Sequence, residues 1–227
     1  SAKKSRKVNV ELGKRIAIEG ASEEVCKALG IPPEWAQRCE DSFHVGHDGT
    51  RDALANRLDL LFKTGKLGRF EDKMQQCGSY GGGNHFGEAE AVEIGKDDRA
   101  QKIAKTFGLK DNCVAFLSHC GSRGFGYNLA QGQFKALQEK FAMWGLPFPG
   151  EDRELVYAPL GSDEANNYLD DMALGANFAT VNHLLINALK ETFLAKPSGN
   201  IKANIRCGIK KPEQQLCHYD VMSGTII

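Results

Sequence analysis

The chain has 227 residues, of which 41% are hydrophobic and 26% are charged, and 29 Lys and Arg residues balance 29 Asp and Glu residues. This length and composition are ordinary for a globular protein with one large domain or two small ones. The zero net charge argues neither for nor against nucleic-acid binding, because only a local basic patch would matter and a total cannot show one.

Membrane spans, secretory signals and disulfide scaffolds are all disfavoured. The longest apolar runs, such as ANFATVNHLLINAL, contain Asn and His and fall short of the roughly 20 residues that a membrane span needs. The basic N-terminus lacks the apolar segment of a secretory signal. The seven cysteines are odd in number and form no C-x-x-C pair, which predicts mostly buried, reduced thiols in a cytoplasmic protein.

The first 65 residues predict helices. Ser22 is expected to cap a short helix that ends at Gly30, and the two prolines at 32 and 33 are expected to begin another. From Thr50, the segment TRDALANRLDLLFKTGKLG predicts a longer helix, because its apolar residues recur on one face. That face comprises Ala53, Leu54, Leu58, Leu61 and Phe62.

The middle of the chain predicts two strands. The segment FGEAEAVEI alternates, which makes Phe86, Ala89, Ala91 and Ile94 available to a buried side. Residues 99–112 are either a short helix or a charged connection. The apolar run CVAFLSH then predicts an interior strand that ends in His119.

The last third predicts two long helices and a short tail. A Gly/Ser turn after His119 leads into a helix toward Gly145, and Ser162 or Asp163 is expected to cap a second, longer helix. The tail predicts two short strands around a turn at Pro212. These elements together indicate an α/β class, in the α+β sense, with a mixed sheet and flanking helices.

Two histidines stand at strand ends beside glycine turns. His85 lies in GSYGGGNHFGEAE next to Asn84, and His119 begins HCGSRGFG, which contains Arg123. Imidazoles in such places suit a transition metal such as Mn, Zn or Fe, and glycine turns before a helix suit phosphate. A hydrogen-bonded structural role explains either histidine equally well, so the residues alone leave both interpretations open.

A second group of candidate ligands is His44, His47 and Asp48 in FHVGHDGT. The spacing allows an H-x-x-H-D metal site. A solvated loop followed by a helix cap at Thr50 explains the same residues, and we favour that interpretation.

Four further polar residues invite a functional interpretation. Cys120 follows His119, but neighbours on a strand point to opposite faces, so a core position is favoured over a metal ligand or nucleophile. Asn177, Asn182 and His183 lie within the long helix. Buried amides there need hydrogen-bond partners, and a structural use is favoured.

Four segments occur in the order found in the RtcB family of RNA ligases: GGGNHFGEAE, HCGSRGFGYNLA, ELVYAPLGSDEANNYLDDMALGANFATVN and YDVMSG. The chain resembles that family over roughly residues 70–190. Members join RNA ends that carry a 3′-phosphate or 2′,3′-cyclic phosphate to 5′-hydroxyl ends, with GTP and manganese. The residue pattern predicts a helical N-terminal segment over residues 1–69 that the resemblance does not assign, and the resemblance implies an RtcB-like core over residues 70–227, incomplete at both ends.

The resemblance also implies roles for individual residues. His85 and His119 match two manganese ligands of the family, and Arg123 matches an arginine that contacts RNA or phosphate. Asn84 is expected near the phosphates of GTP and Glu88 near the guanine. Metal ions would polarise the attacked phosphate, and cationic side chains would stabilise the charge that develops. The stretch assigned to GTP comprises Asn84, His85, Phe86, Gly87 and Glu88.

The chain departs from the family pattern at three points. The Asp-x-x-Cys-Gly motif expected before His85 is absent, and Cys77 stands in the wrong place to replace it. Ser223 stands where a third metal-binding histidine is expected, with His218 five residues earlier. The histidine that carries GMP belongs to a later motif, so the catalytic nucleophile is expected to be absent from this chain.

We therefore expect a truncated or divergent RNA ligase that acts in tRNA splicing or RNA repair. It would bind GTP, Mn²⁺ and RNA in the cytoplasm, and we expect no association with a membrane. The alternative is a non-catalytic metal- or RNA-binding module derived from such a ligase. A metal-dependent phosphate hydrolase would need a carboxylate-rich site, which the sequence does not display.

Overall fold

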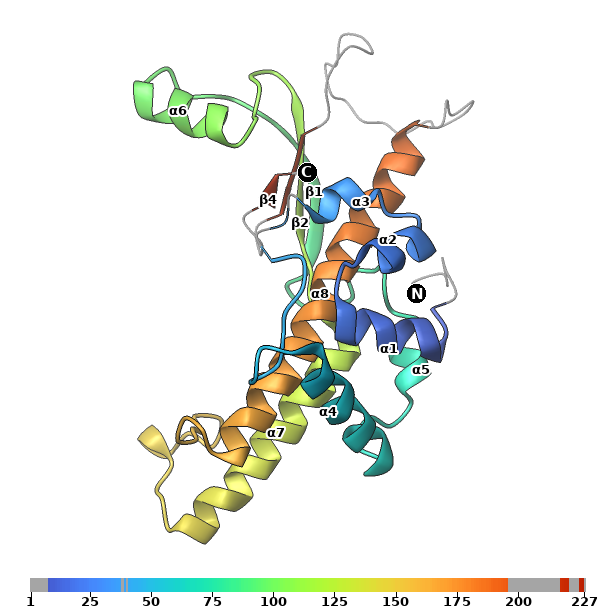
Figure 1. The fold of residues 1–227 in the computed structure, drawn as a ribbon. Coiled ribbons are helices and arrows are strands. Elements are labelled where there is room, and N and C mark those ends of the chain that lie inside the picture. The colour runs from blue at the N-terminus through green and yellow to red at the C-terminus, as the bar shows by residue number, and fades with distance from the viewer. Residues whose placement is uncertain (1–7, 38, 40, 196–216, 221–224, 227) are drawn as a thin grey trace.

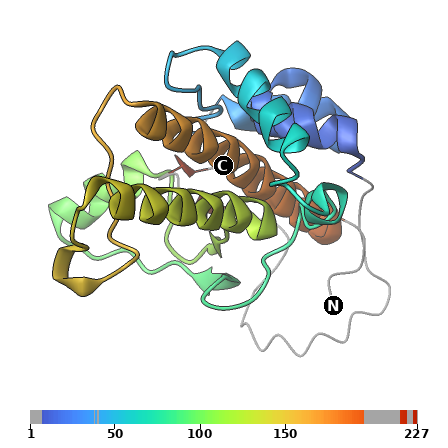
Figure 2. The ribbon, with the colours of Figure 1, turned by 90° about the horizontal axis from the view of Figure 1, so that it is seen from below.

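Helix α8 (Asp163–Ala195) runs through the middle of the helical part of the molecule (Figure 1). The computed structural model describes residues 8–37, 39, 41–195, 217–220 and 225–226. Helix α7 (Arg123–Trp144) runs beside α8, and both views show the two as a pair (Figures 1 and 2). A 3-10 turn, η1 (Pro149–Glu151), lies in the connection between them. None of the described helices has the length and apolar character of a membrane-crossing segment.

Five short helices come from the N-terminal third: α1 (Val10–Glu19), α2 (Glu23–Leu29), α3 (Pro33–Ala36), α4 (Arg51–Lys63) and α5 (Phe70–Met74). The side chains of Ser22 and Thr50 accept backbone N–H bonds at the starts of α2 and α4, as the sequence predicts. Gly30 ends α2 in the left-handed conformation, which glycine adopts without a Cβ penalty. Local capping chemistry therefore determined these boundaries.

One hydrophobic core joins the N-terminal helices to the long pair. Apolar side chains of α1, α2, α4 and α5 meet those of α7 and α8, and α1 and α4 both pack on α8 (Figure 1). Burying each large apolar side chain contributes about 1.5–3 kcal/mol. The division at residues 69 and 70 stays a prediction, although both segments contribute to this core. Its largest fully buried members include Ile16, Leu29, Leu54, Leu58, Phe125, Phe178, Leu184 and Leu185.

A mixed sheet has the order β1-β2-β3-β4. Strand β1 (Phe86–Ala91) pairs antiparallel with β2 (Val114–His119), which pairs parallel with β3 (Cys217–Asp220); β4 (Thr225–Ile226) is antiparallel to β3. Helix α6 (Asp98–Thr106) connects β1 to β2. The mixed sheet, the flanking helices and the interior position of β2 confirm the α/β prediction. Pro212 lies outside the described residues.

The buried side predicted for β1 is wrong. All six residues of the strand are exposed, including Phe86, Ala89 and Ala91, and Ile94 beyond it is half-buried. Alternation marks a two-faced strand, but burial also requires a second layer over one face. The described elements supply no such layer over β1, which stands beside the helices rather than beneath them (Figure 1).

Candidate functional site

Strand pairing brings the two glycine-flanked histidines together. Phe86 of β1 is the register partner of His119 at the end of β2, so His85 arrives beside His119. The ring centroids of His85 and His119 are 5.6 Å apart with the planes inclined at 45°, and the Phe86 ring also lies 5.6 Å from His119. Both imidazoles are half-buried.

The ring of His85 has a buried nitrogen with no hydrogen-bond partner among the described residues, and its pKa is lowered. That nitrogen is Nδ1. Burial lowers the pKa of the ring, and electrostatic interactions with His119 and Arg123 lower it further, while a hydrogen bond with the Tyr80 backbone acts in the opposite direction. A neutral imidazole with an unpaired ring nitrogen can bind a metal ion or form a hydrogen bond with a polar ligand.

Arg123 extends from the start of α7 toward the same loops. Its φ is +54°, and its Nη1 donates to the carbonyl of Tyr80 at 3.0 Å. Burial lowers the pKa of the guanidinium, and its Nε has no hydrogen-bond partner among the described residues. A partly buried guanidinium with an unused N–H suits a phosphate or carboxylate oxygen.

At position 81 of the glycine run, there is no room for a side chain. The φ of Gly81 is +95°, and a Cβ there would lie 1.3 Å from Nη1 of Arg123. Glycine at this position therefore lets the guanidinium cross the loop. Gly83 also has a positive φ of +73°, but a Cβ there would have nothing within 4 Å.

The stretch assigned to GTP lies along the outer strand. Asn84, Gly87 and Glu88 are exposed, as is Phe86 at 37%. Gly87 has a packing role, because a Cβ there would lie 2.0 Å from the Tyr80 hydroxyl. The structure places these residues within one segment beside His119, and their contacts with a nucleotide stay a prediction.

Two imidazoles, one of which has an unpaired ring nitrogen, offer donors of a kind that transition metals such as manganese bind. Within the described part of the chain, no group of three or more His, Cys, Asp or Glu side chains is placed to hold a metal. Further ligands would therefore have to come from beyond the described residues. The side chain of His218 is among those not described.

The His44, His47 and Asp48 group is a docked loop with a helix cap. Nδ1 of His47 lies 3.0 Å from each carboxylate oxygen of Asp170, and this bond raises the pKa of the imidazole. Asp48 accepts from the backbone and hydroxyl of Thr50. The predicted helix cap at Thr50 is confirmed, but the loop is docked on α8 rather than simply solvated. The partner Asp170 was not foreseen because it is distant in sequence.

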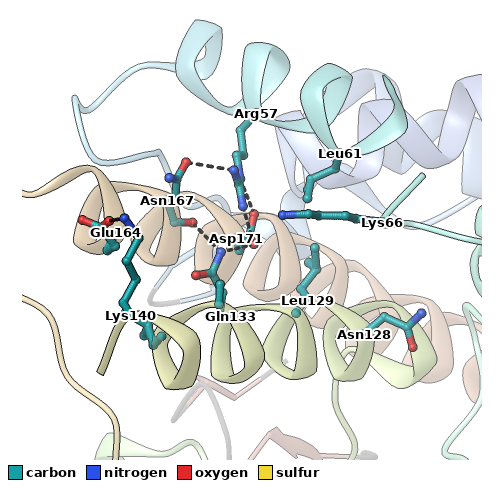
Figure 3. A pocket seen from close by; sticks show the side chains of 13 residues that line it. Arg57, Leu61, Lys66, Asn128, Leu129, Gln133, Lys140, Glu164, Asn167 and Asp171 are labelled. Carbon is teal, nitrogen blue, oxygen red and sulfur yellow. Dashed lines mark hydrogen bonds and ion pairs between the residues drawn. The ribbon is translucent and has the colours of Figure 1, made fainter. Parts of the chain in front are cut away.

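A polar cavity of about 300 Å³ lies between α4, α7 and α8 (Figure 3). Arg57 donates from Nε at 2.7 Å and from Nη2 at 3.0 Å to the two oxygens of Asp171, and from Nη1 to Asn167 at 2.8 Å. Gln133 also donates to Asp171, and Figure 3 shows Lys66 extending toward this group. Sequence reasoning missed the cavity, because Arg57 reads as a polar position on an amphipathic helix.

Three polar residues of α8 are buried and hydrogen-bonded, in agreement with the structural use that the sequence predicts. Asn177, Asn182 and His183 are all buried and hydrogen-bonded to backbone atoms. Cys120 is 1% exposed, which confirms its core position.

Comparison with known proteins identifies relatives. A family model described as tRNA-splicing ligase RtcB matches residues 3–218. The tRNA-splicing ligase RtcB of Pyrobaculum aerophilum is 36% identical over 181 residues, which are 79% of this chain and 34% of that protein. The tRNA-splicing ligase RtcB of Nanoarchaeum equitans is 33% identical over 183 residues, 80% of this chain and 36% of that protein. The chain therefore spans about a third of the length of these relatives.

Proposed function

Because this chain belongs to the RtcB family of tRNA-splicing ligases, we propose that it carries part of the metal- and nucleotide-binding site of an RNA ligase. The reaction joins 3′-phosphate or 2′,3′-cyclic phosphate ends to 5′-hydroxyl ends of tRNA halves or cleaved RNA in the cytoplasm. One observation carries the proposal: two half-buried imidazoles lie 5.6 Å apart and one has a buried nitrogen with no hydrogen-bond partner among the described residues.

Each site residue has a proposed task. His85 and His119 ligate Mn²⁺, which when bound polarises a phosphate for attack. Arg123 binds a phosphate oxygen through its unused Nε–H, because the guanidinium is held against the loop by the Tyr80 carbonyl. Asn84 contacts the phosphates of GTP and Glu88 the guanine, with Phe86 and Gly87 completing the segment. The exposed strand leaves these residues open to a nucleotide.

Metal titration tests this proposal directly. We expect the purified chain to bind Mn²⁺ stoichiometrically in calorimetry, and His85→Ala to weaken binding at least about tenfold. His44→Ala is the matched control, since its backbone N–H bond to Asn177 survives the substitution. Equal Mn²⁺ affinity in all three proteins, or no binding in any, would contradict the proposal.

A second candidate is a non-catalytic metal- or RNA-binding module. It is favoured by the finding that the described residues hold two imidazoles but no group of three metal-ligating side chains, whereas a catalytic metal site typically has at least three protein ligands. We expect no covalent GMP adduct after incubation with labelled GTP and Mn²⁺. Metal binding without an adduct supports the module, whereas an adduct on this chain would overturn it and favour a self-sufficient ligase.

A further inference from the structure

A buried asparagine of α8 joins the two histidine loops. Asn182 is 0% exposed, and its Oδ1 accepts from the N–H of Gly78 at 2.7 Å and from that of Ser79 at 3.2 Å. Its Nδ2 donates to the carbonyl of Ser79 at 3.2 Å and to that of Gly121 at 2.9 Å. Gly78 and Ser79 precede the glycine run that leads to His85, and Gly121 lies two residues after His119.

The amide of Asn182 has its bonding capacity filled. A primary amide offers two N–H donors and two oxygen lone pairs, and the four bonds to the two loops use them all. A contact of Nδ2 with the Cys120 sulfur at 3.5 Å is additional. Because the group is buried, moving either loop away would leave at least one N–H or lone pair of the amide unpaired, and that is costly in a water-free interior.

The neighbouring residue reinforces this link. His183 accepts the backbone N–H of Cys120 at its Nε2 over 3.2 Å, and its Nδ1 lies 3.0 Å from the carbonyl of Ala179. The pattern is that of a neutral ring with its proton on Nδ1. Two successive residues of α8 therefore hold the backbone immediately after His119.

Gly121, whose carbonyl Asn182 binds, lies next to the ring of His85. A Cβ on Gly121 would lie 3.5 Å from Nε2 of His85, so the peptide that Asn182 holds borders the His85 ring. Gly78, with φ +80°, is packed so closely on α8 that a Cβ there would lie 3.1 Å from Leu185. Both loops thus rest on one short segment of α8.

We propose that Asn182 is a positioning residue that sets the separation of the His85 and His119 rings. Through that separation it controls Mn²⁺ affinity at the proposed site, so this part of the inference rests on the proposed function. Groups that orient metal ligands without touching the metal typically change affinity 10- to 100-fold when removed.

Asn177 provides a closely matched control. It lies on the same helix, is also 0% exposed, and accepts the N–H of His44 at 2.6 Å. Its Nδ2 donates to the carbonyls of Ala17 at 2.9 Å and His44 at 3.0 Å. It therefore holds a different loop with the same chemistry, so substitution of either asparagine should cost similar stability.

The test compares Asn182→Asp with Asn177→Asp in metal-free protein. Aspartate keeps an oxygen for the accepted N–H bonds but places a second oxygen against backbone carbonyls, which breaks the link to Gly121. With ¹³C-labelled histidine, we expect NOE cross-peaks between the His85 and His119 rings in the unmodified chain and in Asn177→Asp, and their loss in Asn182→Asp. Persistence of the cross-peaks in Asn182→Asp, or their equal loss in both variants, would overturn the proposal.

Native-state hydrogen exchange on the unmodified chain keeps the proposal testable if Asn182→Asp does not fold. The amides of Gly78, Ser79 and Cys120 should open together, because their acceptors are adjacent on α8. Independent opening of the two loops would overturn the proposal.

A Mn²⁺ titration separates this inference from the proposed function. We expect Asn182→Asp to bind Mn²⁺ about 10- to 100-fold more weakly than Asn177→Asp. Equal affinity in the two variants would overturn the control of metal binding by Asn182. If the unmodified chain binds no Mn²⁺, the proposed function fails, while the NOE and exchange results still decide whether Asn182 positions the rings.

Discussion

Two polar clusters of this protein differ in whether their groups are satisfied. Around the α4–α7–α8 junction, Arg57 and Asp171 form a two-point ion pair that Asn167 and Gln133 complete. At the histidine loops, by contrast, ring and guanidinium nitrogens of His85 and Arg123 are buried without a hydrogen-bond partner among the described residues. Both clusters lie between elements distant in sequence, and both are partly removed from water.

The difference distinguishes a structural network from the proposed binding site. Buried polar groups in folded proteins are normally hydrogen-bonded, and an exception calls for a ligand, an ion or a catalytic role. The Arg57 network meets that requirement internally, so it needs no ligand to be stable. The histidine loops do not meet it, so a metal and a phosphate would complete them. Substitutions should therefore affect unfolding at the first cluster and ligand binding at the second.

The largest loss of stability is expected from Arg57→Leu. The substitution leaves the carboxylate of Asp171, with a side chain only 4% exposed, buried without its cation, which costs about 3–5 kcal/mol. Urea unfolding measures this, and Mn²⁺ affinity should not change. The double variant Arg57→Leu/Asp171→Leu should recover much of the loss. A cost below about 1 kcal/mol for the single variant would remove the contrast between the clusters.

Gly81→Ala is expected to have an intermediate effect. A left-handed backbone costs a residue with a side chain about 1–2 kcal/mol, and the new Cβ would also displace the Arg123 guanidinium. Gly83→Ala is the matched control, since it has a positive φ but open space around the Cβ. Urea unfolding should show the greater loss for Gly81→Ala, together with weaker binding of an RNA 3′-phosphate. Identical losses in both properties would show that Arg123 does not depend on Gly81.

His85→Ala should change the free energy of unfolding by less than about 1 kcal/mol, because Nδ1 gives up no hydrogen bond. The same variant is the one expected to lose Mn²⁺ affinity. Thermal unfolding in the presence of a chelator isolates the protein's own stability from that of a bound metal. A loss comparable to that of Arg57→Leu would show that His85 is a structural residue.

The smallest effect is a pH dependence at the docked loop of His47. Its bond to Asp170 raises the pKa of the imidazole, so the folded state binds a proton more tightly than the unfolded state. The resulting stabilisation is complete below the unfolded pKa of about 6.5 and is lost as pH rises through the folded pKa. Urea unfolding between pH 5.5 and 8.5 should therefore show a steeper decline for the unmodified chain than for His47→Gln. Parallel curves would contradict this.

Local signals in the sequence predicted most helices and strands. They failed to predict burial, which depends on whether another layer of structure covers an element. The caps at Ser22 and Thr50 and the apolar stripe of α4 were read correctly because each depends on residues within a few positions. The burial of β1 was predicted wrongly because alternation does not reveal whether anything covers the strand. The two histidine loops were singled out from the glycine turns and strand ends around them, the family resemblance gave them their roles, and their contacts with GTP and RNA stay predictions.

What the sequence determined by itself is the chemistry: capped helices, two strands that end at glycine turns, and imidazoles and an arginine beside them. The tertiary structure alone decided which of these groups meet. Antiparallel pairing places His85 beside His119, and packing leaves His85 Nδ1 without a partner among the described residues. Helix α8 supplies Asp170 and Asn182 to distant loops and Asp171 to Arg57 of α4. Hydrogen bonds and charge interactions act over a few ångströms in space, and the chain brings such neighbours together only when its strands pair and its helices pack.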